Sequence, residues 1–261
     1  MSDMQDMLGM SREMAEGTDT NVDIVFVIDA TRSMEPLIEK VKNATLVFHD
    51  GLTEALRENK RIIKNLRARV IWFRDFYFDG KYAYGESPFF LLPEEKEAFH
   101  DFVASIEAKG GYDAPESALE ALTLAMRSDF VQEGDKKRHV IVLFTDEEAH
   151  SFEDRKALTE EAAKLGCTPE LYPENMPEDY KELANAWAGN EETQTALGVD
   201  GQTKLDRSGR RLVIFAPDAY PWTDMEMEWE NVIRVSMEQG GSGEDLDMAD
   251  VYSMIAHSLS N

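Results

Sequence analysis

The feature that most constrains the fold is the segment from Val22 to Ile28, an almost uninterrupted apolar run that ends at Asp29. A strand of this kind is typical of parallel sheets whose two faces are both covered by helices. A second such run, His139 to Phe144, ends at Thr145-Asp146. Further strands are expected at 69–73, 87–92, 212–216 and 231–235. We therefore expect a sheet of about six strands.

Segments with apolar residues three or four positions apart lie between these strands and predict helices. They fall at about 37–55, 93–109, 115–127, 157–165, 180–188 and 247–259. Strands that alternate with helices need right-handed crossovers, which predicts a doubly wound, mostly parallel α/β fold. We interpret residues 21–261 as one domain that includes a long, helical, insertion-like segment at about 166–210. Residues 1–20 are interpreted as a polar N-terminal extension.

The charge of the chain limits its partners. Acidic side chains outnumber basic ones by 52 to 27, which gives a formal net charge of −25. Such a surface repels phosphate backbones and anionic headgroups, so neither nucleic acid nor a membrane is expected as a partner. It attracts cations and basic protein surfaces, although solubility alone is an equally good reason for the charge. The single cysteine, Cys167, and the lack of a secretory pattern favour a cytoplasmic setting.

The clearest chemical pattern is Asp29-Ala30-Thr31-Arg32-Ser33, directly after the first strand. Alternate residues of an extended chain share a side, so Asp29, Thr31 and Ser33 are expected to point to one place. Ligands of open α/β sheets bind at the carboxyl ends of the strands. A carboxylate with two hydroxyls is an all-oxygen set of the kind that Mg²⁺ prefers. The alternative is a simple turn in which Ser33 caps the next helix.

Two more elements follow at later strand ends. Gly110-Gly111 allows a tight turn ahead of Asp113, which comes just before a predicted helix. The alternative for Asp113 is a capping box with Glu116. Asp146 follows the most hydrophobic strand, where a lone Asp is usually a turn residue.

In this order, the three elements resemble the metal-ion-dependent adhesion site of the von Willebrand factor A family. That pattern is an Asp-x-Ser/Thr-x-Ser loop, a Gly-rich loop with Thr or Asp, and an Asp loop. The resemblance covers residues of about 21 to 260 and looks closest to intracellular prokaryotic members. It implies a Rossmann-like fold and a Mg²⁺, Mn²⁺ or Ca²⁺ ion held by Asp29, Thr31, Ser33, Asp113 and Asp146. Phe73-Arg74-Asp75 is similar to a Tyr-Arg-Asp stretch of that family and is expected to brace loops.

The resemblance also implies a function in protein recognition, as an adaptor or complex subunit and not as an enzyme. Asp113 stands where many members have Thr, so the local charge with the cation becomes about −1. We therefore expect firm metal binding and a partner that presents a neutral oxygen or binds mainly through the loops. Around the site, four residues are expected mainly as exposed loop residues, with partner contact as the alternative: Arg32, Tyr112, Glu147 and His150.

Two alternatives remain open. An Asp after a buried strand is also found as the nucleophile of haloacid-dehalogenase-like, Mg²⁺-dependent phosphohydrolases. That family needs a second Asp two positions on, where this chain has Thr31, and no clear lysine and acidic pair follow. The other alternative is a metal-free structural module.

Overall fold

The computed structural model describes residues 20–58, 63–112, 115–199, 205–240 and 246–260. At the centre of the sheet lies β1 (Thr20–Asp29), because its apolar residues are buried on both faces. It pairs in parallel with β2 (Asn65–Phe73) on one side and β5 (Lys136–Phe144) on the other. The parallel sheet continues through β6 (Arg210–Ala216) to β7 (Val232–Ser236). The expected doubly wound, mostly parallel α/β class is confirmed.

The sheet has seven strands where six were expected. Two short strands, β3 (Tyr84–Glu86) and β4 (Phe90–Leu92), both pair with β2 in antiparallel fashion. The segment at 87–92 was expected to form one strand, and β4 occupies its second half. With three residues, β3 is too short to show an apolar alternation, so the sequence carried no signal for it.

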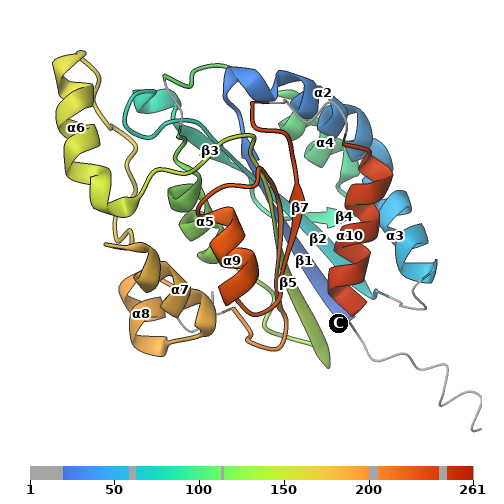
Figure 1. The fold of residues 1–261 in the computed structure, drawn as a ribbon. Helices are drawn as coiled ribbons and strands as arrows, with labels where there is room; N and C mark the ends of the chain where they lie inside the picture. Colours follow the sequence, from blue (N-terminus) through green and yellow to red (C-terminus); the bar gives the residue numbers. More distant parts are fainter. Residues whose placement is uncertain (1–19, 59–62, 113–114, 200–204, 241–245, 261) are drawn as a thin grey trace, which may run out of the picture.

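Helices cover both faces of the sheet (Figure 1). One face packs Ile24, Phe26 and Ile28 against a group of helices, and Val25 and Val27 point to the other. The first face carries α2 (Glu35–Ala44), α3 (Phe48–Glu58), α4 (Lys96–Ala104) and α10 (Met248–Ser260). The second carries α5 (Ala118–Met126), α7 (Tyr180–Ala188) and α9 (Trp222–Glu228). Two further helices, α6 (Arg155–Lys164) and α8 (Glu191–Ala196), lie toward one side of the molecule (Figure 1).

Some helix boundaries differ from the prediction. The helix expected at about 37–55 is divided into α2 and α3 by a 3₁₀ turn, Thr45–Val47. The Thr45 hydroxyl donates to the carbonyl of Lys42 and contacts the His100 ring, which holds the turn against α4. The helix α8 lies within the segment at about 166–210 that was expected to be helical, although its bounds were not predicted, and α9 was not predicted. The expected 1–20 extension is outside the described residues except for Thr20, which begins β1.

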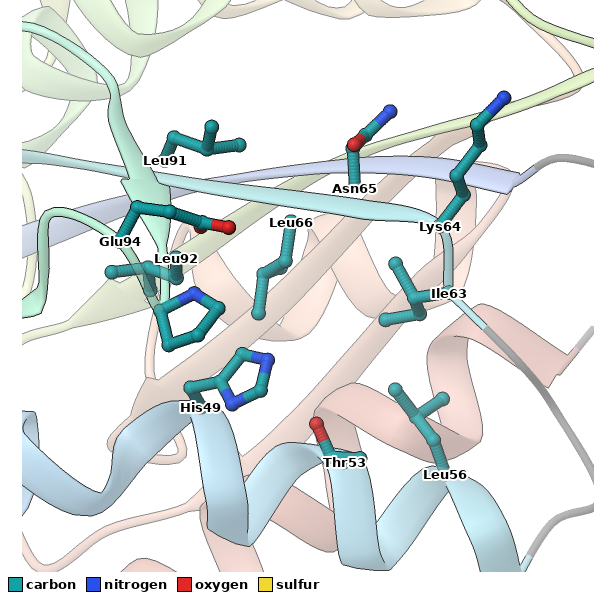
Figure 2. Close-up of a pocket in the computed structure, with 11 residues that line it drawn as sticks. His49, Thr53, Leu56, Ile63, Lys64, Asn65, Leu66, Leu91, Leu92 and Glu94 are labelled. Carbon is teal, nitrogen blue, oxygen red and sulfur yellow. The ribbon is translucent and has the colours of Figure 1, made fainter.

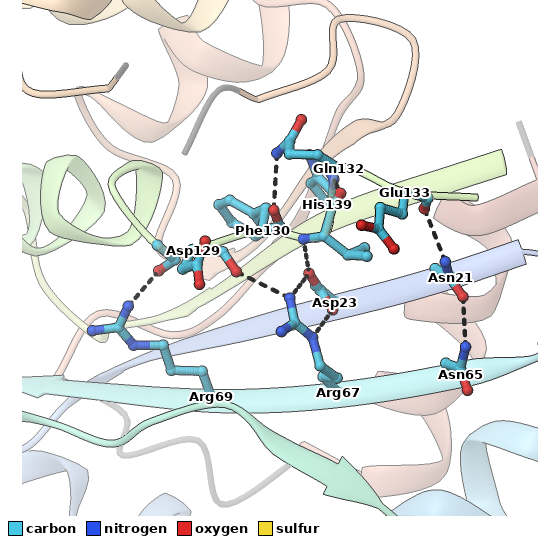
Figure 3. A network of polar contacts seen from close by, with 12 residues as sticks. Asn21, Asp23, Asn65, Arg67, Arg69, Asp129, Phe130, Gln132, Glu133 and His139 are labelled. Atoms are coloured by element: carbon cyan, nitrogen blue, oxygen red, sulfur yellow. Dashed lines mark hydrogen bonds and ion pairs between the residues drawn. The ribbon is translucent and has the colours of Figure 1, made fainter. Parts of the chain in front are cut away.

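Near their amino-terminal ends, β1 and β2 are joined by an ion pair between a buried carboxylate and a half-buried arginine (Figure 3). Arg67 of β2 donates from Nε and Nη2 to the two carboxylate oxygens of Asp23 in β1, at 2.8 and 2.6 Å. The backbone N–H of Val131 also donates to Asp23. A cavity of about 480 Å³ opens beside the start of β2, between α3 and β4 (Figure 2). No helix in the described ranges is long and apolar enough to cross a bilayer.

Candidate metal centre

Asp29, the last residue of β1, is fully buried at the carboxyl edge of the sheet. Its Oδ1 accepts hydrogen bonds from the backbone N–H and the hydroxyl of Thr31, at 2.8 and 2.6 Å. Its Oδ2 accepts a hydrogen bond from the hydroxyl of Thr145, directly after β5, at 2.9 Å. These contacts hold the carboxylate in one orientation between the ends of two neighbouring strands.

Ser33 links this group to Asp146. Its hydroxyl lies 3.3 Å from the Thr31 hydroxyl and donates to Oδ1 of Asp146 at 3.1 Å. Asp146 is fully buried, whereas Ser33 is exposed, so the cluster opens to solvent at Ser33. In the structure Ser33 does not cap a helix, since neither the turn Arg32–Met34 nor α2 has a side-chain cap. The oxygen atoms of Asp29, Thr31, Ser33 and Asp146 therefore converge as the sequence predicts.

The electrostatics of the cluster favour a cation. The pKa of Asp29 is raised to about 7: burial is the largest cause, the nearby carboxylate of Asp146 adds to it, and the hydrogen bonds from Thr31 and Thr145 oppose it. Two acidic groups that share a buried site disfavour each other's ionised forms, and a positive ion between them relieves this.

The donors also fit a hard cation, because all of them are oxygen atoms. Within the described residues, no group of three or more His, Cys, Asp or Glu side chains has the arrangement of a metal site. Two members of this cluster are hydroxyl residues, which such a group does not include. The predicted ligand Asp113 lies outside the described residues, so its role stays a prediction.

The glycine loop approaches the cluster closely. Gly111 has a φ of +74°, and a Cβ there would lie 3.1 Å from Cβ of Thr31 and 3.0 Å from Oε1 of Glu116. Glu116 is buried, and its backbone is hydrogen bonded to Glu148 and His150 of the loop after β5. The sequence interpretation gave Glu116 only a capping role and missed it as an acidic neighbour of Thr31. It also missed Thr145 as a partner of Asp29, although a hydroxyl beside a strand-end Asp was a usable signal.

Arg74 joins the loops around the site, as its place in the Phe-Arg-Asp stretch predicts. It is buried and donates from Nε to the carbonyl of Ala30, from Nη1 to Tyr82 and from Nη2 to Glu107. The distances are 3.2, 2.9 and 2.7 Å. One guanidinium thus connects the end of β1, the turn before β3 and the approach to the glycine loop.

The expectation for His150 as an exposed loop residue is wrong. Its side chain is buried, and Nε2 lies 3.1 Å from Oδ2 of Asp75. Arg32 is exposed as expected, and Glu147 is half-buried. Tyr112 is 58% exposed and stacks on Phe78, with ring centroids 4.7 Å apart.

The contacts of Asp29 bear on the phosphohydrolase alternative. The position that would need an acid/base Asp holds Thr31, whose hydroxyl is used to bind Asp29 itself. Among the described residues, no lysine forms an ion pair or hydrogen bond with Asp29. At this position, therefore, the chain has a hydroxyl that binds Asp29 in place of the acid/base carboxylate of that reaction.

Comparisons with known proteins find only remote likeness. No protein-family model matches the sequence, and no curated protein matches it. The fold is similar to the pilus adhesin SpaC from Lactobacillus rhamnosus GG, with 12% identity and a TM-score of 0.48. It is also similar to the PilB minor pilin from Streptococcus sanguinis, with 14% identity and a TM-score of 0.47. A third similar structure is proximal thread matrix protein 1 from the mussel byssus with a zinc-occupied MIDAS motif, with 11% identity and a TM-score of 0.44.

Each alignment covers 94% of this chain but only 31%, 63% and 48% of the three matched chains, respectively. The chain therefore spans less than two thirds of each of them. Because the identities and TM-scores are this low, the functional reading depends on the geometry of the site alone.

Proposed function

We propose that this protein binds one divalent cation, Mg²⁺ in the first place, at the carboxyl edge of its sheet and uses it to recognise a protein partner. The observation that carries the proposal is the convergence of Asp29, Thr31, Ser33 and Asp146, from two strand ends, into one hydrogen-bonded oxygen cluster. Mn²⁺ and Ca²⁺ are the alternative ions.

In this proposal Thr31 and Ser33 hold the ion through their hydroxyls, and Asp29 and Asp146 bind it directly or through water. Asp113 is the proposed fifth ligand. A divalent ion supplies positive charge to the buried carboxylates and a coordination position for an oxygen of the partner. The exposed side of the cluster lies at Ser33, so the partner approaches there. With three carboxylates near the ion, a neutral oxygen is favoured over a partner carboxylate.

Isothermal titration of Mg²⁺ and Mn²⁺ into chelator-stripped protein tests the cation step. We expect saturable one-site binding that Asp29→Ala, Asp113→Ala and Ser33→Ala each weaken at least tenfold. The control is Asp101→Ala, which removes an exposed carboxylate from α4 and should leave binding unchanged. Absence of binding to the wild type at millimolar metal would reject the proposal in favour of a metal-free structural module.

The recognition step needs a separate comparison. Wild-type and Ser33→Ala proteins are each immobilised, and proteins retained from a cell extract are compared in Mg²⁺ and in chelator. A partner that the wild type retains only in Mg²⁺, and that Ser33→Ala does not retain, supports metal-dependent recognition. Hydrolysis of a generic phosphate ester that is lost in Asp29→Asn would instead support the phosphohydrolase.

A further inference from the structure

A column of four aromatic rings runs from the surface into the second face of the sheet. Tyr220 contacts Tyr180 of α7 with ring centroids 5.9 Å apart, and Tyr180 contacts Trp229 at 5.9 Å. Trp229 stacks on Trp187 at 5.7 Å. Trp187 is almost fully buried, whereas Tyr220 is 45% exposed. The column therefore has an inner end in the core and an outer end in solvent.

The inner end already holds a cation. The guanidinium carbon of Arg210, a fully buried residue of β6, lies 5.4 Å from the centre of the Trp187 ring. Its only ion pair among the described residues is with Glu230 at 3.6 Å. Aromatic faces carry negative electrostatic potential and attract cations, so Trp187 contributes to stabilising this buried charge. At the outer end, the aromatic side chain of Tyr220 is partly exposed to solvent.

Three carboxylates act on the outer end, two of them from α9. Burial raises the pKa of the Tyr220 hydroxyl, and the negative charges of Glu153, Asp224 and Glu228 raise it further. Within the described ranges, none of these three carboxylates forms an ion pair. Other acidic groups of the same region are compensated: Asp218 and Glu226 bind Arg234, and Glu230 binds Arg207 and Arg210.. The three carboxylates that act on Tyr220 are therefore ones without an ion-pair partner among the described residues.

This surface lies at the same edge of the sheet as the oxygen cluster. Tyr220 belongs to the segment between the end of β6 and α9, as Asp146 belongs to the segment after β5. The two segments are joined, because the indole N–H of Trp222 donates to the carbonyl of Glu147 at 2.9 Å. A protein that binds at the oxygen cluster can therefore extend over Tyr220.

We propose that the exposed ring of Tyr220, which packs against Tyr180, forms a docking surface with the carboxylates of Asp224, Glu228 and Glu153 for an arginine or lysine side chain in a basic segment of a protein partner. The inference deepens the proposed function, on which it rests for the identity of the partner as a protein. Binding of a basic side chain to this surface does not itself require the metal ion. A phosphate-bearing ligand is disfavoured, because the same carboxylates repel it.

Titration with a hexa-arginine peptide, in chelator and at moderate salt, tests the surface directly. Because the chain carries a net charge of −25, any polycation is attracted to it, so the result depends on matched variants. Tyr220→Leu should weaken binding about two- to fivefold, the range of an exposed cation–π contact, and Tyr220→Phe should not. The control is Tyr112→Leu, a similarly exposed tyrosine beside the oxygen cluster, which should leave the affinity unchanged.

A second pair of variants separates local from overall charge. The double variant Asp224→Asn/Glu228→Gln and the control Glu170→Gln/Glu174→Gln remove the same number of negative charges from different surfaces. The first should weaken peptide binding more than the second, and thermal melting confirms that all variants are folded. Equal losses in the members of either matched pair, or no binding by the wild type, would overturn the docking surface. Failure of the proposed cation site appears separately, as absence of Mg²⁺ binding, and leaves this measurement unaffected.

Discussion

In the metal-free protein, burial disfavours the ionised form of the Asp29 carboxylate. The carboxylate is fully buried beside Asp146, and burial raises its pKa to about 7 from 3.8. Asp29→Asn keeps the shape of the side chain and removes the charge. At pH 8 we expect it to stabilise the metal-free protein, on the order of 2 kcal/mol in urea unfolding.

The same substitution should abolish the increase in melting temperature that we expect Mg²⁺ to give the wild type, because a proposed ligand of the ion loses its charge. A variant that is more stable than the wild type in chelator but gains no stability from Mg²⁺ would thus identify Asp29 as a ligand of the cation. The exposed control Asp101→Asn should change neither measurement. A destabilised metal-free protein that still responds fully to Mg²⁺ would mean that Asp29 has only a structural role.

Gly111 tests how closely the glycine loop must approach Thr31. Gly111→Ala combines an unfavourable positive φ with a Cβ only 3.1 Å from Thr31, whereas Gly166→Ala has a similar φ of +79° and open space around it. The conformational cost of alanine at such a φ is about 1 kcal/mol and should appear in both variants. Only Gly111→Ala should lose further stability, by about 1–2 kcal/mol, and weaken Mg²⁺ binding. Equal unfolding free energies for the two variants would show that the Thr31 side chain moves away from the added Cβ without a measurable cost in stability.

At this scale the sequence predicted residues that are near one another in the chain. Asp29, Thr31 and Ser33 share a side because alternate residues of an extended segment must do so. Contacts between distant segments were not visible. His150 was expected in solvent, because nothing local indicates that Asp75 lies 3.1 Å from it in the fold. Glu116 was missed for the same reason, since its position depends on how the glycine loop packs.

Arg74 holds the loops around the candidate metal site in position by connecting three segments of the chain. Its guanidinium donates to three carbonyls in three different segments, a pattern that one lysine ammonium on a flexible stem cannot reproduce. Arg74→Lys should therefore weaken Mg²⁺ binding several-fold, although Arg74 is not itself a proposed ligand. It should also speed hydrogen exchange at the amide of Lys109, which donates to the carbonyl of Ala30.

The matched control is Arg207→Lys, because Arg207 is 71% exposed and pairs only with Glu230 among the described residues. This variant should leave both Mg²⁺ binding and exchange unchanged. Unaltered metal affinity in Arg74→Lys, at normal folding, would show that the loops are positioned without this residue.

Elements with strong periodic patterns were predicted well. The strands β1 and β5 are long apolar runs, and the helix α7 was expected at its observed bounds, Tyr180–Ala188. The helix α9 was missed because its sequence, WTDMEME, is only seven residues long and has just one buried apolar pair, Trp222 and Met225, at helical spacing. It is held by tertiary contacts, through the buried side chains of Trp222 and Met225. The division between α2 and α3 was missed because the apolar spacing continues through the 3₁₀ turn.

For the whole molecule, the net charge and one buried histidine give opposite responses to acid. Protonation of carboxylates reduces the self-repulsion of a chain with a net charge of −25 and so favours folding as the pH falls. His139 acts in the other direction. Its Nδ1 accepts the N–H of Asp206 at 3.3 Å, so Nε2 carries the proton and donates to the carbonyl of Val131 at 2.8 Å. Burial lowers the pKa of this histidine below 6.5.

Because the folded pKa of His139 is lowered, the unfolded chain binds its proton at a higher pH than the native protein does. The stabilisation by neutral His139 is therefore fully present above about pH 6.5 and is lost as the pH falls through the lower folded pKa. We expect His139→Gln to cost about 1–2 kcal/mol at pH 8 and clearly less at pH 5. Urea unfolding of the wild type and the variant at both pH values measures this difference, from which the common effect of net charge cancels. His257→Gln, on the exposed side of α10, reports the loss of a surface histidine. A cost of His139→Gln that stays constant or grows toward pH 5 would show that the buried ring does not remain neutral in the native protein.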